Sequence, residues 1–291
     1  MRPIWIALIA VSVLPANPLP AQAETVDALS PQSGAIVLTE AQAQIGLSDD
    51  YSFYGPEDAR TILVEIWENP PSQAENALGI VMPAGDDPRQ QSWGAIITWE
   101  PIGWVDSDDA RNTDYAGLMV QMQSAARALN AQRRAEGYPE VQVLGWAQEP
   151  RYDSVAHTVS WARELHFFDD EPNALHYDMR LLGRRGVLSM NIVGTMDQLA
   201  QIRAGAADLA GRTEFDSGAR YEDFEAGRDD VAAYGVAGVV ATGVGVAVAK
   251  NVGAMALLGK LLQPLGIALL VLGTAMLTPL RRLFSRKKPD N

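Results

Sequence analysis

The chain has 291 residues, 47% of them hydrophobic, and a formal net charge of −13. It contains no cysteine, which excludes disulfide bonds and thiol chemistry. An acidic surface repels the phosphates of nucleic acids, so the composition also argues against a nucleic-acid partner.

The N-terminal 23 residues have the pattern of a secretory signal peptide. Arg2 supplies a positive charge, and an apolar run from Ile4 to Leu14 follows it. Prolines then break the helix before the small-x-small sequence Ala21-Gln22-Ala23, and we expect cleavage before Glu24. The alternative is an uncleaved N-terminal anchor, but the apolar run is short for a membrane span.

Charge is segregated along the rest of the chain. Residues 24–230 hold 35 acidic and 15 basic residues, a net charge of −20, and every basic one is Arg. Residues 231–291 hold seven basic residues against Asp290 alone, a net charge of +6. About two hundred residues can bury roughly 70% of their unfolded surface, so we expect residues 24–230 to fold without disulfides. Solubility alone would explain the acidity.

Hydrophobic periodicity in this acidic segment indicates mixed α and β structure. A helix is expected to begin at Pro56, where proline suits the first turn, and to end near Trp67. Strand-like runs follow at Leu78–Met82 and Trp93–Trp99. The longest helix is expected from Asp114 to Glu136, because a glycine and a proline follow directly.

A β-hairpin is the best-specified element. Its strands, His176–Leu182 and Val187–Val193, flank the turn Gly183-Arg184-Arg185-Gly186. Pairing symmetrically about this turn brings together Leu181 with Leu188, Met179 with Met190, and Tyr177 with Ile192. Each apolar side chain then meets another, which is how a half-buried hairpin fixes its register.

A third strand, Thr158–Phe168, can join this hairpin through the loop Asp169–Asn173. We predict that Leu165 lies opposite Tyr177 and that Trp161 lies opposite Leu181. The three strands would share one apolar face, which the long helix is expected to cover.

A last helix is expected to begin at Thr195, which can form a capping box with Gln198. The predicted fold class is therefore α+β: an antiparallel sheet covered by amphipathic helices, followed by a C-terminal transmembrane anchor.

The anchor is predicted at Leu261–Leu280, twenty uncharged residues that can cross about 30 Å of hydrocarbon as a helix. Five basic residues follow, so the positive-inside rule places the tail 281–291 in the cytoplasm. A second uncharged run, Val231–Ala249, is rich in glycine. Two spans would leave the basic tail outside, so we favour one span with 231–259 as a helix at the membrane surface. A hairpin of two spans stays open.

Five short motifs occur in order along the chain. They are Asn69-Pro70-Pro71, Ser92-Trp93-Gly94, Gly137-Tyr138-Pro139, the segment Leu182–Leu188, and Ala232-Ala233-Tyr234-Gly235. Together they resemble a family of predicted membrane-anchored bacterial proteins known only as a domain of unknown function. The resemblance runs from about Gly34 to the basic tail. It implies an exported domain with a C-terminal anchor, mostly in Gram-negative bacteria, and implies no activity.

No established catalytic motif is present. The sequence lacks the Gly-x-Ser-x-Gly elbow, the His-Glu-x-x-His zinc motif and the phosphate-binding loop. The segment Asp106–Asp109 resembles a calcium loop, but Arg111 replaces the turn glycine and Gly117 the bidentate glutamate. A solvated loop is the better interpretation, and we expect no cofactor.

A metal site is the sharpest chemical hypothesis. In the predicted register, His166 and His176 face each other on the polar side of the sheet, and Glu164 and Asp178 form the neighbouring pair. Two imidazoles and two carboxylates suit zinc or another divalent cation. The alternative is a solvated strand face. The related proteins tend to have Asn at position 176, which weakens the metal interpretation.

Six tryptophans lie in the acidic segment. Trp161 matches the apolar face of the strands and is expected in the core. Trp99, Trp104 and Trp146 lie near loops, where exposed rings would stack on sugars or peptides. Core packing is the more common role for any one of them.

The absence of a catalytic motif favours a non-enzymatic binding, scaffold or sensing module on the periplasmic side of the inner membrane. Its expected partners are the lipid bilayer, through the C-terminal helix, and an envelope protein or cell-wall ligand. The alternative is a metal-dependent or otherwise unfamiliar envelope hydrolase. Convergent polar groups in a deep cleft would favour the enzyme, and a flat apolar patch would favour binding.

Overall fold

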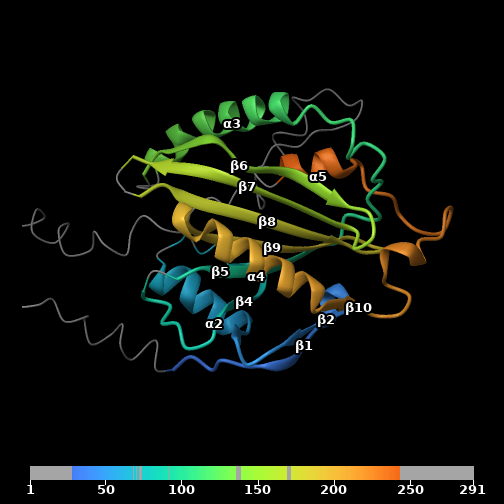
Figure 1. Ribbon diagram of the computed structural model, residues 1–291, viewed down its shortest axis with the longest axis horizontal. Coiled ribbons are helices and arrows are strands. Elements are labelled where there is room, and N and C mark those ends of the chain that lie inside the picture. The colour runs from blue at the N-terminus through green and yellow to red at the C-terminus, as the bar shows by residue number, and fades with distance from the viewer. Residues whose placement is uncertain are drawn as a thin grey trace, which may run out of the picture.

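The computed structural model describes residues 28–242, apart from 68, 70, 72–73, 91, 136–138 and 169–171. Seven strands form one antiparallel sheet, in the order β3-β4-β5-β9-β8-β7-β6, and a smaller sheet has the order β1-β2-β10 (Figure 1). The strands are β1 Gly34–Leu38, β2 Ala43–Leu47, β3 Tyr51–Tyr54, β4 Ala77–Pro83, β5 Gly94–Glu100, β6 Val141–Asp153, β7 Thr158–Phe167, β8 Ala174–Leu182, β9 Val187–Thr195 and β10 Thr213–Phe215.

Helices cover both faces of the large sheet. On one face, α3 (Tyr115–Ala135) packs along β6, α5 (Val236–Thr242) packs on β7, and α2 (Pro56–Thr61) packs on β4. Helix α2 continues as a π-helical segment over Ile62–Ile66. On the opposite face, α4 (Leu199–Gly211) packs on β8 and β9, beside the small sheet (Figure 1). The result is an α+β fold with a cover on each side of the sheet.

Several predicted elements are confirmed. The long helix and the strands β4 and β5 begin and end within one residue of their predicted bounds in the part that the structure describes. The β8–β9 hairpin has the predicted register, with Met179 opposite Met190. At the start of α4 the predicted capping box is present, because the Thr195 N–H donates to Gln198 Oε1 at 3.0 Å.

The predicted register between β7 and β8 is wrong by three residues. Trp161 lies opposite Asp178, and its predicted partner Leu181 lies opposite Thr158. The prediction matched apolar residues across the strands, which assumes that only one face of the sheet is buried. All nine residues of β8 are buried, so apolar matching could not distinguish its two faces.

The cover of the hairpin was also predicted wrongly. Met179 and Met190 pack with Ile202 and Leu209 of α4, not with the long helix α3. Helix α3 instead belongs to the cluster around Trp161, on the other face. Because both faces of β8 and β9 are buried, the sheet needs a helix on each side.

Strand β6 and the small sheet were not predicted. The pairing of β6 with β7 shifts register at three points, so the alternation of exposed and buried residues is lost along its middle. Helix α5 lies within the uncharged run from Val231 and contributes Val236 and Val240 to the core. Residues 236–242 are therefore part of the packed domain.

The predicted signal peptide, the span Leu261–Leu280 and the basic tail lie outside the described residues. The second uncharged run is described only as far as Thr242. In the described part of the chain, no helix combines the length and the apolar character needed to cross a membrane.

Candidate functional site

The four predicted metal ligands do not converge. His176 pairs with Arg163 across β7 and β8, and directly paired residues share a face of the sheet. Glu164 and His166 are one and three residues from Arg163, so they lie on the opposite face from His176 and Asp178. The register on which the metal hypothesis depended is therefore wrong.

On their own face, His166 and Glu164 share one partner. His166 Nδ1 lies 3.0 Å from Asn173 Oδ1, and Asn173 donates to Glu164 Oε1 at 2.7 Å. Within the described residues there is no group of three or more side chains of His, Asp or Glu that could hold a metal ion.

The face that carries His176 and Asp178 is not solvated, contrary to the alternative interpretation. Arg163, His176, Asp178 and Arg180 are at most 4% exposed, and we call them the buried charge cluster. Asp178 accepts from Arg163 at 2.7 Å and from Arg180 at 2.9 Å. Burial raises the pKa of Asp178, but the neighbouring cations outweigh it and lower that pKa overall. Burial lowers the pKa of His176 to about 3, so its ring is neutral.

The tryptophans mostly serve packing. Trp161 is fully buried, as predicted, and its ring lies 5.2 Å from the Arg180 guanidinium carbon. The half-buried indole of Trp104 stacks on Phe224 with ring centroids 4.3 Å apart. The Trp146 N–H donates to the Tyr115 carbonyl at 3.2 Å. Trp161 thus packs within the sheet, Trp146 joins β6 to the start of α3, and Trp104 joins two segments that lie outside the strands.

A groove of about 1010 Å³ lies on the α4 face, where the sheet extends beyond the helix. We call it the α4 groove. Its floor is β7 and β8, and its walls are α4, β10, the β6–β7 turn and residues 220–222. The residues that line it include Gln148, Ser160, Tyr177, Met179, Leu181, Ala207, Ala210 and Phe215, with Arg151, Asp153, His157, Arg203, Glu214, Arg220, Tyr221 and Glu222 among its polar and charged lining.

The arginines of the groove are exposed, and the side chain of Arg220 donates from Nε to the Phe215 carbonyl at 3.4 Å. Arg151, Arg203 and Arg220 form no ion pair among the residues that the structure describes. Among the carboxylates of the groove, Asp153 accepts hydrogen bonds from the backbone N–H groups of residues 155 and 156, at 2.8 and 3.0 Å. Glu214 is exposed on β10. The basic and acidic side chains that line the groove therefore balance, although residues 24–230 as a whole carry a net charge of −20.

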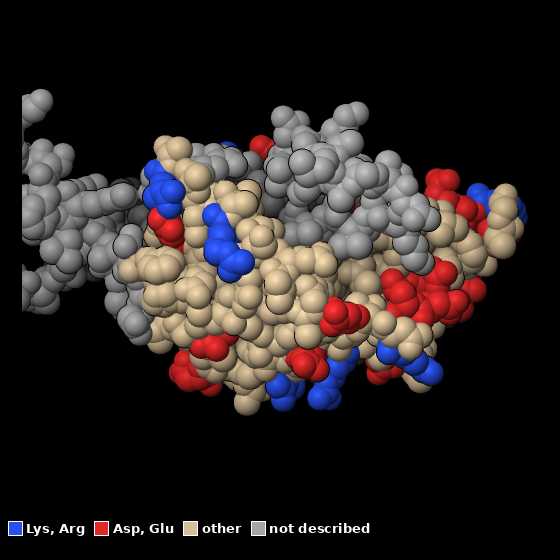
Figure 2. Space-filling view, turned by 90° about the horizontal axis from the view of Figure 1, so that it is seen from above, with Lys and Arg blue, Asp and Glu red and all other residues tan. Residues whose placement is uncertain are grey.

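Acidic side chains are unevenly distributed over the surface of the molecule. Figure 2 shows them concentrated toward one end of the molecule, the end at which the segment 216–231 lies in Figure 1. That segment carries six acidic residues against two arginines.

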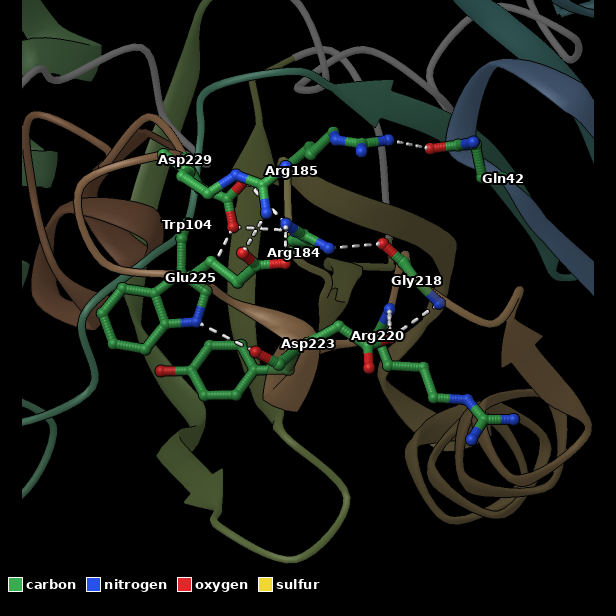
Figure 3. A network of polar contacts seen from close by, with 11 residues as sticks. Gln42, Trp104, Arg184, Arg185, Gly218, Arg220, Asp223, Glu225 and Asp229 are labelled. Atoms are coloured by element: carbon green, nitrogen blue, oxygen red, sulfur yellow. Dashed lines mark hydrogen bonds and ion pairs between the residues drawn. The ribbon is translucent and has the colours of Figure 1, made fainter.

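One arginine of the hairpin turn holds this segment in place (Figure 3). Arg184 donates to both carboxylate oxygens of Asp229, at 2.7 and 3.0 Å, and to Glu225 at 3.2 Å. It also donates to the Gly218 carbonyl at 3.3 Å. The guanidinium holds the pKa of Asp229 below its usual value. Arg184 therefore positions the wall of the groove that contains Arg220.

Aromatic stacking fixes the same wall. Trp104 stacks on Tyr221 with centroids 5.0 Å apart, and its N–H donates to the Tyr221 carbonyl at 3.2 Å. His157 stacks on Tyr221 at 4.2 Å, and the Tyr221 hydroxyl donates to the Val105 carbonyl at 2.8 Å. Burial raises the pKa of Tyr221 to about 12. Stacking and hydrogen bonds therefore hold this end of the groove in place.

The glycines of the turn Gly183–Gly186 are required by close contacts. A Cβ atom on Gly183 would lie 2.9 Å from the Phe215 ring, and one on Gly186 would lie 2.1 Å from the Glu100 carbonyl oxygen. The turn Gly183–Gly186 therefore has two positions at which neighbouring atoms leave no room for a Cβ, and between them lies Arg184, which binds the segment 216–231. The sequence showed the motif but gave no sign of the groove, whose walls come from distant parts of the chain.

Comparisons with known proteins give little about function. Among solved structures, the chain is similar to the solution structure of cyanobacterial PsbP (CyanoP) from Synechocystis sp. PCC 6803. The identity is 10% and the TM-score 0.35, over 65% of this chain and 92% of that chain, which is too weak to support an argument. A comparison with curated proteins found no match.

The family resemblance carried by the five motifs is confirmed. The model of the family described as "Protein of unknown function (DUF2167)" matches residues 30–275. Since this match covers most of the chain, the protein belongs to the DUF2167 family.

Proposed function

We propose that this protein is a non-enzymatic binding module of the bacterial envelope, and that the α4 groove holds an extended peptide with acidic side chains. The observation that carries this proposal is the groove itself, which is about 1010 Å³ in volume and open to solvent, and is therefore neither the deep cleft expected of an enzyme nor a flat apolar patch. This is the upper end of the range for small-ligand pockets, roughly 300–1,000 Å³. A short stretch of extended chain fits such a groove better than a compact cofactor does.

The lining defines the chemistry of the occupant. The half-buried Phe215 offers apolar surface to the body of a peptide, and the buried Met179 and Leu181 lie beneath the groove. Arg151 and Arg203 present free guanidinium groups at the sides, and these bind carboxylates in a bidentate manner. The occupant is therefore a peptide that combines apolar and carboxylate side chains, from an envelope protein or from the cell wall.

A binding test can use defined probes. Two fluorescent hexapeptide pools, identical except for Glu or Gln at the variable positions, would be titrated against the full chain in detergent and followed by anisotropy. We expect the Glu pool to bind at least about tenfold more tightly, because hydrogen bonds to charged groups are worth about 1.5–3 kcal/mol. Arg203→Gln should remove most of that preference, whereas Arg127→Gln, on the exposed side of α3, should leave it unchanged. Equal binding of the two pools would contradict the proposal.

One observation favours the enzymatic alternative. In the groove, the Tyr152 hydroxyl lies 3.2 Å from His157 Nδ1, and a phenol beside an imidazole can exchange protons with a substrate. An acid–base pair alone is not a hydrolase, which also needs an activated nucleophile or water. Mass spectrometry of the peptide pools after incubation decides this point. We expect intact peptides, and cleavage that His157→Gln abolishes would establish the hydrolase.

The envelope location is part of the proposal and rests on the sequence. The signal-like N-terminus and the run Leu261–Leu280 with its basic flank support a periplasmic domain held at the inner membrane, with the lipid bilayer as the partner of the C-terminal helix. Reporter fusions at Asp290 test it. Cytoplasmic fluorescence without phosphatase activity is expected, and phosphatase activity there would support two spans instead of one.

A further inference from the structure

The buried charge cluster lies on the face of the sheet opposite the α4 groove. His176 pairs with Val193, which belongs to the apolar cluster under α2, and Asp178 pairs with Trp161, which belongs to the apolar cluster under α3 and α5. A row of charged side chains therefore runs between two apolar clusters. Charges at such a depth are stable only when they are paired and hydrogen-bonded.

The positive and negative charges within this cluster do not balance. Asp178 is the one carboxylate among its four residues, and its two oxygens accept from Arg163 and Arg180. Arg180 donates its other terminal nitrogen to Asn191 Oδ1 at 2.9 Å, which adds no charge. With His176 neutral, two guanidinium groups face one carboxylate, so the cluster carries one excess positive charge.

A further carboxylate on this face, that of Glu100, is not paired with these arginines. Glu100 is half-buried, and it accepts the Ser189 hydroxyl at 2.8 Å. Among the described residues it forms no ion pair with Arg163 or Arg180.

The pairing is also incomplete in hydrogen bonds. Four buried nitrogens of this face have no partner among the residues that the structure describes: Trp161 Nε1, Arg163 Nε, Arg163 Nη1 and His176 Nε2. Arg163 Nη2 lies 2.9 Å from His176 Nδ1, and because arginine can only donate, Nδ1 is the acceptor. The proton of the neutral ring then sits on Nε2. All four unpartnered nitrogens are therefore donors.

Buried donors without acceptors are rare, and each costs about 1–3 kcal/mol unless water or an ion satisfies it. A water molecule could accept hydrogen bonds from two of these donors, but it would also bring two protons and no charge. A small anion accepts several N–H groups and neutralises the excess charge at the same time. The unpartnered N–H donors and the excess positive charge therefore both favour a small anion.

We infer that the buried charge cluster binds a small monovalent anion of the chloride type beside Arg163, held by the unpartnered N–H groups of that guanidinium. This inference is independent of the proposed function, because the cluster and the α4 groove lie on opposite faces of the sheet. The bound anion would complete the core and stabilise the folded protein.

Thermal unfolding of the full chain in detergent tests the site, with chloride exchanged for gluconate at constant ionic strength. Gluconate is too large for a buried site, so it serves as the reference anion. We expect a saturable rise in Tm with chloride, of about 5 °C or more at a hundredfold excess over the dissociation constant. Arg163→Gln removes the excess charge and should abolish the rise. The matched control Arg212→Gln, at an exposed helical ion pair, should retain it.

A direct measurement keeps the inference testable if Arg163→Gln fails to fold. Crystals of the wild-type chain grown in bromide should show an anomalous peak within hydrogen-bonding distance of Arg163 Nη1 or Arg163 Nε. A Tm that is the same in chloride and gluconate, or a water molecule with no bromide at this position, would overturn the inference.

Discussion

His176 should make the folded protein sensitive to mild acid. Its folded-state pKa is about 3, because burial disfavours the charged ring beside Arg163 and Arg180, although Asp178 opposes this effect. In the unfolded chain the pKa of histidine is about 6.5. Below that pH the unfolded state binds a proton that the folded state does not. The stability due to His176 is therefore fully present above about pH 6.5 and is lost as the pH falls toward 3.

The expected size follows from these two pKa values. One proton bound only by the unfolded state lowers the free energy of unfolding by about 1.4 kcal/mol per pH unit. Between pH 7.0 and 4.5 this amounts to about 2.5 kcal/mol, which for a domain of this size lowers Tm by about 5 to 10 °C. Urea denaturation at pH 7.0 and 4.5 measures it, with wild type and His176→Asn compared at both values.

The variant should lose this part of the pH dependence, whatever its stability at pH 7.0. His166→Asn is the matched control: its ring is half-buried on the other face, and the variant should keep the full difference between the two pH values. NMR titration of the wild-type imidazoles covers the case in which His176→Asn does not fold. A His176 signal that titrates near pH 6.5, or identical pH dependence in both variants, would refute this reasoning.

Two further predictions concern the core and the turn. Met190 is fully buried, so Met190→Asp should destabilise by several kcal/mol, whereas Val120→Asp, at a site 61% exposed, should change the free energy of unfolding by less than about 0.5 kcal/mol. A melting point of Met190→Asp within about two degrees of the parent would show that this burial is wrong. Gly186→Ala places a Cβ 2.1 Å from the Glu100 carbonyl and should cost about 1–3 kcal/mol by urea denaturation. Gly211→Ala meets no atom within 4 Å and should be nearly neutral, so equal effects would contradict the packing.

Local patterns predicted much of the fold. The β8–β9 hairpin was predictable because its strands are symmetric about a four-residue turn, which leaves one register in which Met179 meets Met190. The helix caps were predictable for a similar reason, since Thr195 and Gln198 interact within one turn. Such signals need no knowledge of the rest of the chain.

The remaining errors have one physical cause. Sequence patterns assign a strand one buried face, but β8 is buried on both, with Tyr177 and Met179 on one side and His176 and Asp178 on the other. Charged residues that pair with each other inside the core look the same in the sequence as charged residues in solvent. The β7–β8 register and the metal hypothesis failed for this reason.

The α4 groove could not be predicted because it depends on tertiary structure. Arg151 lies beside the β6–β7 turn, Arg203 on α4 and Arg220 beyond β10, so nothing in the local sequence relates them. Strand β6, which also lines the groove, could not be predicted because its bulges interrupt the alternation of buried and exposed residues.

A charge-swap experiment tests the central claim most directly. Arg203→Glu would be titrated with hexapeptide pools that carry Glu or Lys at the variable positions. If the groove reads the charge of a bound peptide, the wild type should prefer the Glu pool and Arg203→Glu should prefer the Lys pool, while Arg127→Glu on α3 keeps the preference of the wild type. An unchanged preference in Arg203→Glu, or binding of neither pool by the wild type, would contradict the assignment of the groove as a peptide-binding site.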